Sequence, residues 1–238
     1  MKIYGKNAVT EALRSAQAVS VVTISDGLNK DFASLVLSLC KKRNISLKTI
    51  SRAEFKKIEG EENYQGIFAE VEDYNYFDLE TLLEQKNIFL LLLDGIEDPH
   101  NFGAIIRVAE CAGVTGIIIP KNRSVSINAT VAKVSAGALS HVKIAQVTNI
   151  HDAIDKIKNS NTFVYAADMD GETMYNTNLD GNIAIVVGSE GKGVSSLTRK
   201  KVDGIVSIPM FGQVNSLNAS VSAGIVLYEV VRQRMKNE

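Results

Sequence analysis

Six consecutive apolar residues, from Ile88 to Leu93, constrain the fold of this 238-residue chain more than any other feature. A strand with one face in water alternates apolar and polar side chains. An unbroken run of this length therefore predicts a strand buried on both faces, as in a parallel sheet. The run is far shorter than the roughly 20 apolar residues that a membrane-spanning helix requires. We therefore expect an α/β protein with no membrane partner.

Further β-branched runs follow along the chain, with helical stretches between most of them and a long final helix over Leu217–Met235. This alternation predicts an open, mostly parallel sheet covered by helices, with ligands bound beyond the carboxyl ends of its strands. We assign this unit to residues 87–238. Its later strands are expected at Gly116–Ile119, Val142–Val147, Thr162–Ala166, Ile183–Val187 and Ile205–Ile208.

A smaller α/β unit is expected over residues 1–73, followed by an acidic and aromatic linker at 74–86. Helical spacing is present over Asn7–Ser15 and again between Phe32 and Cys40. Ser51 and Glu54 have the spacing of a capping box at the start of a further short helix. The strands of this unit are expected at Val19–Ile24, Ile45–Ile50 and Gly66–Val71.

The net charge of -1 conceals a strong local imbalance. Eight basic residues and only two acidic ones lie between Lys30 and Lys57, whereas Glu59–Glu84 holds nine carboxylates and no basic residue. A basic patch is the usual electrostatic contribution to binding a phosphate-bearing partner, although a solvated helix face is the commoner explanation of an isolated cluster. The residues expected to contact RNA are Lys30, Lys41, Lys42, Arg43, Lys56 and Lys57.

The composition gives no support to a metal site, a disulfide framework or secretion. Cys40 and Cys111 have neither CxxC nor Cys/His metal spacing, and the amino-terminal residues lack the apolar segment of a secretory signal. We therefore expect a cytoplasmic protein that binds no metal. His100, His141 and His151 are assigned no catalytic role.

Three loops carry the residues best suited to chemistry, and the first runs from Asp94 to Arg107. Asp98 and Pro99 form a favourable N-cap and first-turn pair for a helix. Asn101 falls in the first turn, and Arg107 lies nearly two turns further along. Taken singly, Asn101 is more typical of a capping residue and Arg107 of a surface ion pair.

The second loop, Gly188–Ser195, contains three glycines, which permit close backbone approach to a ligand. It is not a Walker P-loop, because Gly193 follows Lys192 where Ser or Thr is required. It also lacks the last glycine of the dinucleotide fingerprint, because Ser196 occupies that place. A tight turn at this point would direct the carboxylate of Glu190 toward whatever the glycines admit.

The third loop, Ile208–Gly224, places Ser216 and Asn218 at the start of the final helix, where ordinary capping is the simplest explanation. The three loops together resemble the SpoU/TrmH branch of the SPOUT methyltransferases over Ile88–Arg234, in order and in spacing. Among these enzymes the resemblance is strongest to the bacterial 23S rRNA guanosine 2'-O-methyltransferases. The segment Gly5–Arg14 resembles the start of the substrate-binding domain found in some members.

The resemblance implies a SPOUT domain with a parallel sheet and a deep trefoil knot, preceded by a small α/β RNA-binding domain like ribosomal protein L30e. It further implies a homodimer that uses S-adenosyl-L-methionine to methylate a ribose 2'-OH of a guanosine in 23S rRNA. An arginine side chain keeps its proton in proteins and is therefore a poor general base. Arg107 is accordingly expected to clamp an RNA phosphate. The implied cofactor-binding residues are Gly188, Ile208, Ser216 and Leu217, and the implied catalytic residues are Asn101, Arg107, Glu190, Ser216 and Asn218.

Three other functions compete with this one. A related enzyme could methylate tRNA or another rRNA site. An enzyme that binds a nucleotide or NAD could use Gly188–Gly193, although both glycine motifs fail there. A non-catalytic RNA-binding protein could keep the same fold, but it would have no need for the polar residues of the three loops.

Overall fold

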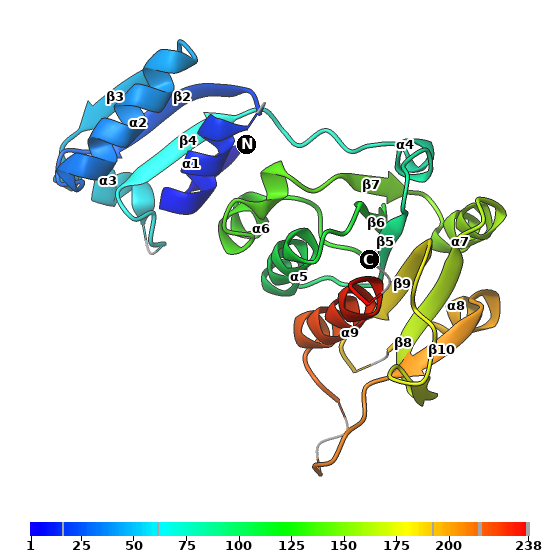
Figure 1. The fold of residues 1–238 in the computed structure, drawn as a ribbon. Coiled ribbons are helices and arrows are strands. Elements are labelled where there is room, and N and C mark those ends of the chain that lie inside the picture. Colours follow the sequence, from blue (N-terminus) through cyan, green and yellow to red (C-terminus); the bar gives the residue numbers. More distant parts are fainter. Residues whose placement is uncertain (16, 61, 192, 214–215, 237–238) are drawn as a thin grey trace. The chain divides into compact units, whose positions relative to one another are not determined.

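The computed structural model describes residues 1–15, 17–60, 62–191, 193–213 and 216–236, which form two compact units (Figure 1). The first unit consists of Met1–Asn75 and Ile127–His141, and the second of Tyr76–Ser126 and Val142–Glu238. Lys192 and residues 214–215, which fall in two of the predicted loops, lie outside the described residues.

The second unit is built on a six-stranded sheet in the order β10-β8-β9-β5-β6-β7, in which every neighbouring pair is parallel. The prediction of a parallel sheet is confirmed, and Leu90, Leu91 and Leu92 of the central strand are completely buried. The strands are β5 (Phe89–Asp94), β6 (Gly116–Pro120), β7 (Ile144–Val147), β8 (Phe163–Thr173), β9 (Ile183–Gly188) and β10 (Gly204–Ser207).

Helices cover both faces of this sheet (Figure 1). On one face, α5 (Pro99–Cys111) packs against α9 (Ala219–Arg234), and α9 also contacts β8 and β9. On the other lie α4 (Leu79–Leu83), α7 (Ile150–Asn159) and α8 (Ser196–Lys201). Successive side chains of a strand point to opposite faces, so an unbroken apolar strand supplies both layers of the core.

The segment predicted to be a linker contributes to the core of the second unit. Leu79 and Leu82 of α4 are buried in one hydrophobic cluster with Leu90, Leu92 and Ile154. Two leucines in a helix of five residues are too few to show a period, so the acidic residues around them dominated the prediction.

Strand β8 extends well beyond its predicted end at Ala166. It continues to Thr173 because its second half pairs with β10, after a shift of register between Ile205 and Val206. A bulge of this kind depends on the partner strand, and the sequence of Ala166–Thr173 gives no period-two pattern that would indicate it.

The first unit contains a four-stranded sheet in the order β1-β4-β2-β3, parallel only between β2 and β3. The capping box predicted at Ser51 and Glu54 is present. Strand β1, at three residues, was too short to predict. The elements are β1 (Lys2–Tyr4), β2 (Val19–Ser25), β3 (Ser46–Ile50), β4 (Ile67–Val71), α1 (Lys6–Arg14), α2 (Lys30–Lys42) and α3 (Arg52–Glu59).

A segment from the middle of the chain completes this first unit. Helix α6 (Ala129–Val134) contacts β1 and α1, and the 3-10 turn η1 (Ala138–Ser140) contacts α1. The ammonium of Lys133 lies 4.7 Å from the ring centre of Tyr4. Gly137 is required here, because a Cβ at this position would come within 2.4 Å of the Glu11 side chain. The division therefore differs from the continuous 87–238 unit expected from the sequence.

A buried carboxylate stabilises the final helix, so its removal should lower the free energy of unfolding. Glu229 is 4% exposed and accepts three hydrogen bonds of 2.7 Å, two from Arg232 and one from Gln233. The bonds from Arg232 hold the pKa of the Glu229 carboxyl below its ordinary value of 4.5. We expect Glu229→Gln to lower the free energy of unfolding by about 1–2 kcal/mol, measured by urea denaturation at pH 7.

The pH dependence provides the check on this explanation. A carboxyl with a lowered pKa contributes stability above its unfolded-state pKa and loses it as the pH falls through its folded-state pKa. The difference between the Glu229→Gln variant and the wild type should therefore shrink in acid. The exposed Glu84→Gln serves as the control. A difference that stays constant down to pH 4 would contradict the role given to the charge.

Candidate active site

The three predicted loops meet where two central strands end. Asp94 at the end of β5 pairs with Gly188 at the end of β9, so the loops that follow them begin side by side. The Oδ2 atom of Asp98 accepts the backbone N–H of Asn101 at 2.9 Å, and Pro99 occupies the first turn of α5. The predicted N-cap of this helix is confirmed, and it leaves the Asn101 side chain free for other contacts.

One residue from each loop joins a single polar cluster. The amide Nδ2 atoms of Asn101 and Asn218 both donate to Oε1 of Glu190, at 2.8 and 2.7 Å. Asn218 Nδ2 also lies 2.9 Å from Asn101 Oδ1. The interpretation of Asn101 as a capping side chain is therefore wrong. Asn218 does cap α9, because its Oδ1 accepts the N–H of Ser220 at 2.9 Å.

The cluster fixes the orientation of an exposed carboxylate. Oε1 of Glu190 receives two neutral donors, while Oε2 accepts no hydrogen bond from any residue that the structure describes. A carboxylate with one oxygen fixed and the other open can orient a hydroxyl group.

Arg107 is not part of this cluster in the single chain. It lies on α5, six residues beyond Asn101, and its side chain is exposed. Within the described residues it forms neither an ion pair nor a hydrogen bond, so the surface ion pair considered for it is absent there. The structure also provides no contact of Arg107 with Glu190 or Asn101. The guanidinium is accordingly available to a partner.

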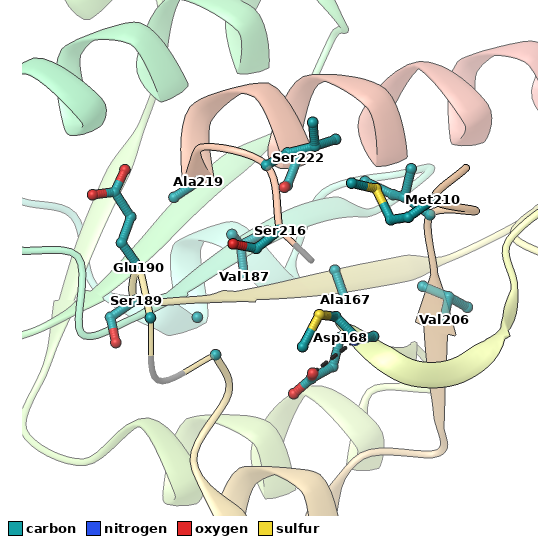
Figure 2. Close-up of a pocket in the computed structure, with 16 residues that line it drawn as sticks. Ala167, Asp168, Val187, Ser189, Glu190, Val206, Met210, Ser216, Ala219 and Ser222 are labelled. Carbon is teal, nitrogen blue, oxygen red and sulfur yellow. Dashed lines mark hydrogen bonds between the residues drawn. The ribbon is translucent and has the colours of Figure 1, made fainter. Parts of the chain in front are cut away.

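A cavity of about 320 Å³ lies beside the cluster, between β8, β9 and the start of α9 (Figure 2). Glu190 borders one end of it and Met210 the other, with Ser216 between them (Figure 2). All four residues predicted to bind the cofactor line this cavity, namely Gly188, Ile208, Ser216 and Leu217.

Two glycines shape the wall of the cavity. A Cβ on Gly188 would lie 2.1 Å from the carbonyl carbon of Gly193 and 2.4 Å from the backbone nitrogen of Val194. Gly193 itself has a φ of 62°, a conformation that favours glycine. Ser189 and Gly193 also pair with each other in a short antiparallel bridge. The loop therefore folds back on the strand end so tightly that no side chain fits at Gly188.

The sequence did not reveal the acidic group at the opposite wall. Asp168 lines the cavity with only 13% of its side chain exposed, and its Oδ2 is 2.5 Å from Nη1 of Arg199. Its place follows from the extension of β8 beyond Ala166, for which there was no local pattern. The residues around Asp168 in β8 form no motif that could have indicated this position.

A second polar network holds the far end of the glycine loop. Oδ2 of Asp94 accepts the hydroxyl of Thr198 at 2.8 Å and the backbone N–H of Ser195 at 3.2 Å. His151 Nε2 lies 3.2 Å from the Thr198 hydroxyl. Thr198 is completely buried. These contacts anchor α8 and the end of the loop to β5, which is a structural role for His151.

The residues predicted to contact RNA occupy separate parts of the first unit. Lys30 begins α2 and Lys41 and Lys42 end it, about 16 Å apart at 1.5 Å per residue. Lys56 and Lys57 lie in the last turn of α3. Arg43 differs from the others, because its guanidinium donates to three carbonyl oxygens, those of Ala12, Leu13 and Gln17. Arg43 therefore caps the carboxyl end of α1 and is not free for phosphate.

Known proteins are similar to this chain in sequence and fold. A model of the SpoU rRNA methylase family matches residues 88–228, and one described as RNA 2'-O ribose methyltransferase substrate binding matches residues 2–77. A protein of Staphylococcus aureus (strain COL), named as a TrmH family tRNA/rRNA methyltransferase, is 40% identical over 238 residues, covering 98% of this chain and 96% of that protein.

The chain belongs to the SpoU rRNA methylase family. Solved structures agree with this assignment. An RNA 2'-O ribose methyltransferase is 26% identical with a TM-score of 0.80, covering 99% of this chain and 89% of the other. The SpoU methyltransferase AviRb of Streptomyces viridochromogenes, solved in complex with AdoMet, is 22% identical with a TM-score of 0.85, covering 99% and 91%. The chain is therefore an RNA methyltransferase, as its three loops predicted.

Two further observations concern the described residues alone. They contain no group of three or more His, Cys, Asp or Glu side chains that could hold a metal ion. None of their helices has the length and apolar content needed to cross a membrane.

Proposed function

We propose that this protein transfers a methyl group from S-adenosyl-L-methionine to a ribose 2'-OH of a guanosine in 23S rRNA. The observation that carries the proposal is the cluster of Asn101, Glu190 and Asn218 at the edge of the 320 Å³ cavity. The cavity has the size of a cofactor site, and the proposal places the substrate hydroxyl at the open Oε2 atom of Glu190, on the border of that cavity. The reaction belongs to the cytoplasm, where bacterial ribosomes are assembled.

The residues of the cavity fit the cofactor chemically. Its volume is within the range of small-molecule sites, and it combines apolar walls with few polar groups. Val187, Val206 and Leu217 suit an adenine ring, while Glu190 supplies negative charge for a cationic ligand. Gly188 and Gly193 pack closely against each other, which lets the glycine loop fold over the end of β9 at the cavity wall. S-adenosyl-L-methionine, when bound, supplies a methyl group on a good leaving group.

The protein then has to position a hydroxyl and allow its proton to leave. Glu190, held by the two asparagine amides, orients the ribose through Oε2. Arg107 clamps an RNA phosphate and so brings the 2'-OH into line with the methyl group. Because a guanidinium does not give up its proton in proteins, we propose that the proton of the hydroxyl passes to the phosphate or to water.

The RNA contacts proposed next rest on the local excess of positive charge in the sequence, and the other fine assignments rest on family resemblance. We propose that RNA docks on the first unit through Lys30, Lys56 and Lys57, with Lys41 and Lys42 adding attraction from the other end of α2. We also propose a homodimer, a trefoil knot in the second unit and an L30e-like first unit. The alternative within the family is a ribose methyltransferase of tRNA or another rRNA site.

Two measurements test the proposal. Calorimetry with S-adenosyl-L-methionine and with NAD should give binding of the first only. Mapping of ribose methylation in total RNA from a strain lacking the protein should reveal one unmethylated guanosine in 23S rRNA. Binding of NAD alone would overturn the proposed cofactor. Loss of a methyl group from tRNA alone would overturn the proposed substrate and favour the alternative.

The role of Arg107 makes a separate prediction. Lysine cannot reproduce the two-pronged contact of a guanidinium with phosphate, so Arg107→Lys should reduce kcat/KM for RNA about tenfold or more with an unchanged pH-rate profile. Arg123→Lys, at another exposed arginine, is the control. Near-full activity with a new titration close to the pKa of lysine would mean that the residue acts as a base.

A further inference from the structure

A second hollow, of about 300 Å³, lies within the first unit and away from the residues described so far as catalytic. It forms where the beginnings of α1, α2 and α3 meet the turns at 25–29 and 63–66. The side chains relevant to its chemistry are Lys6, Asn29, Arg52, Lys56, Asn63 and Gln65.

The hollow is positively charged. Lys6, Arg52 and Lys56 border it, and none of their side chains forms an ion pair with another described residue. The wall contains one carboxylate, Glu59, whose Oε1 accepts the backbone N–H of Tyr64, so the three cations outnumber the negative charge. Three cations that share one small hollow repel one another, and a bound anion would relieve that repulsion.

The three carboxamides in the wall present donors only. The Oδ1 atom of Asn29 accepts the backbone N–H groups of Asp31 and Phe32, at 3.0 and 3.1 Å. The Oδ1 atom of Asn63 accepts the N–H of Gln65 at 2.9 Å. In turn Oε1 of Gln65 accepts the N–H of Lys6 at 2.9 Å.

Each of these amide oxygens therefore already accepts a hydrogen bond, while no described residue accepts one from the three amide nitrogens. The residues that line the hollow thus include three amides whose NH₂ groups have no described acceptor and three cations, one of which, Lys6, also lies 5.2 Å from the ring centre of Phe32. A ligand that satisfies such a wall must be rich in acceptors and negatively charged, which describes a phosphate group. The first turns of α1 and α2 add their positive ends to the same place.

We propose that this hollow binds a backbone phosphate of the RNA substrate, with Lys6, Arg52 and Lys56 as its charged contacts and the amides of Asn29, Asn63 and Gln65 as its neutral donors. The proposal rests on the proposed function, because it assumes an RNA substrate. Within the basic stretch between Lys30 and Lys57, the proposal selects the two cations that border the hollow, Arg52 and Lys56.

The test compares two pairs of substitutions that remove the same charge. Arg52→Gln with Lys56→Gln alters the hollow, whereas Lys48→Gln with Lys86→Gln removes two exposed lysines elsewhere. Binding is measured by fluorescence anisotropy with 23S rRNA and tRNA from a strain lacking the protein, over a series of salt concentrations. Melting curves by circular dichroism confirm that both variants are folded.

We expect the first pair to raise the Kd for RNA at least tenfold and the control pair to raise it less than threefold. Each lost phosphate contact on a single strand changes the slope of log K against log salt by about 0.7, and the hollow holds one phosphate, so the first pair should flatten the slope by about 0.7. The KM for S-adenosyl-L-methionine should stay within twofold of the wild-type value.

Several outcomes would overturn the proposal. Equal weakening by both pairs would mean that net charge alone attracts RNA. Tight binding of adenosine 5'-monophosphate, lost in the first pair while RNA binding is kept, would mean that the hollow takes a free nucleotide. A wild-type protein that methylates neither RNA would instead overturn the proposed function itself. This result can be told apart from failure of the present proposal, in which the enzyme is active but substitutions in the hollow leave its RNA affinity unchanged.

Discussion

Replacing Gly188 with alanine is expected to abolish binding of S-adenosyl-L-methionine and, with it, methyl transfer. The new Cβ would lie 2.1 Å from the carbonyl carbon of Gly193, so the backbone of the loop must move by more than 1 Å to admit it. A displacement of about 1 Å at a site of this kind costs about 100-fold in rate. Calorimetry with the cofactor and a methyl-transfer assay measure the two effects.

Gly212→Ala is the matched control, because a Cβ at Gly212 meets no atom within 4 Å. It should keep both cofactor affinity and melting temperature. If Gly188→Ala bound the cofactor with an affinity close to that of the wild type, the cavity beside β9 would not be the cofactor site.

Asn101→Asp is expected to cause a comparable loss through electrostatics. The substitution preserves size but places a second carboxylate oxygen 2.8 Å from Oε1 of Glu190, where two ionised groups cannot coexist. Glu190 must then turn away, and we expect kcat to fall about 100-fold at pH 8 through loss of orientation.

The pH dependence gives this prediction its sharpest form. Mutual repulsion raises the apparent pKa of the carboxylate pair, so lowering the pH adds one proton that both groups can share. The ratio of variant to wild-type activity should therefore rise from pH 8 to pH 6. Asn122→Asp, at an exposed position, should show no such trend. A ratio independent of pH would contradict the contact between Asn101 and Glu190.

Sequence reasoning succeeded where the determinants are local. The unbroken apolar run of β5 and the Asp98–Pro99 start of α5 each depend on neighbouring residues, and both appear in the structure as predicted. The polar residues of the three loops were found for a related reason. Strand ends in a parallel sheet meet at one edge, so the topology alone brings Asn101 and Glu190 together.

The sequence does not predict features that depend on residues far away in the chain. Arg43 was counted among the RNA-binding cations, but its guanidinium is satisfied by carbonyls about thirty residues earlier, at the end of α1. Asp168 lines the cavity because β8 extends beyond Ala166 and continues to pair with β10 after a shift of register. No pattern within either segment records these pairings.

The segment Ile127–His141 belongs to the first unit although it lies between two parts of the second unit in the sequence, and this limits how the protein can be divided or recombined. The two units are joined by three covalent connections, after Asn75, after Ser126 and after His141. A fragment that ends at Asn75 would lack α6 and η1 and would uncover the surfaces of β1 and α1 that they pack against. Gene fusion at a single point therefore cannot exchange the substrate-binding unit of this enzyme intact. An exchange has to replace two separate stretches of sequence together, Met1–Asn75 and Ile127–His141.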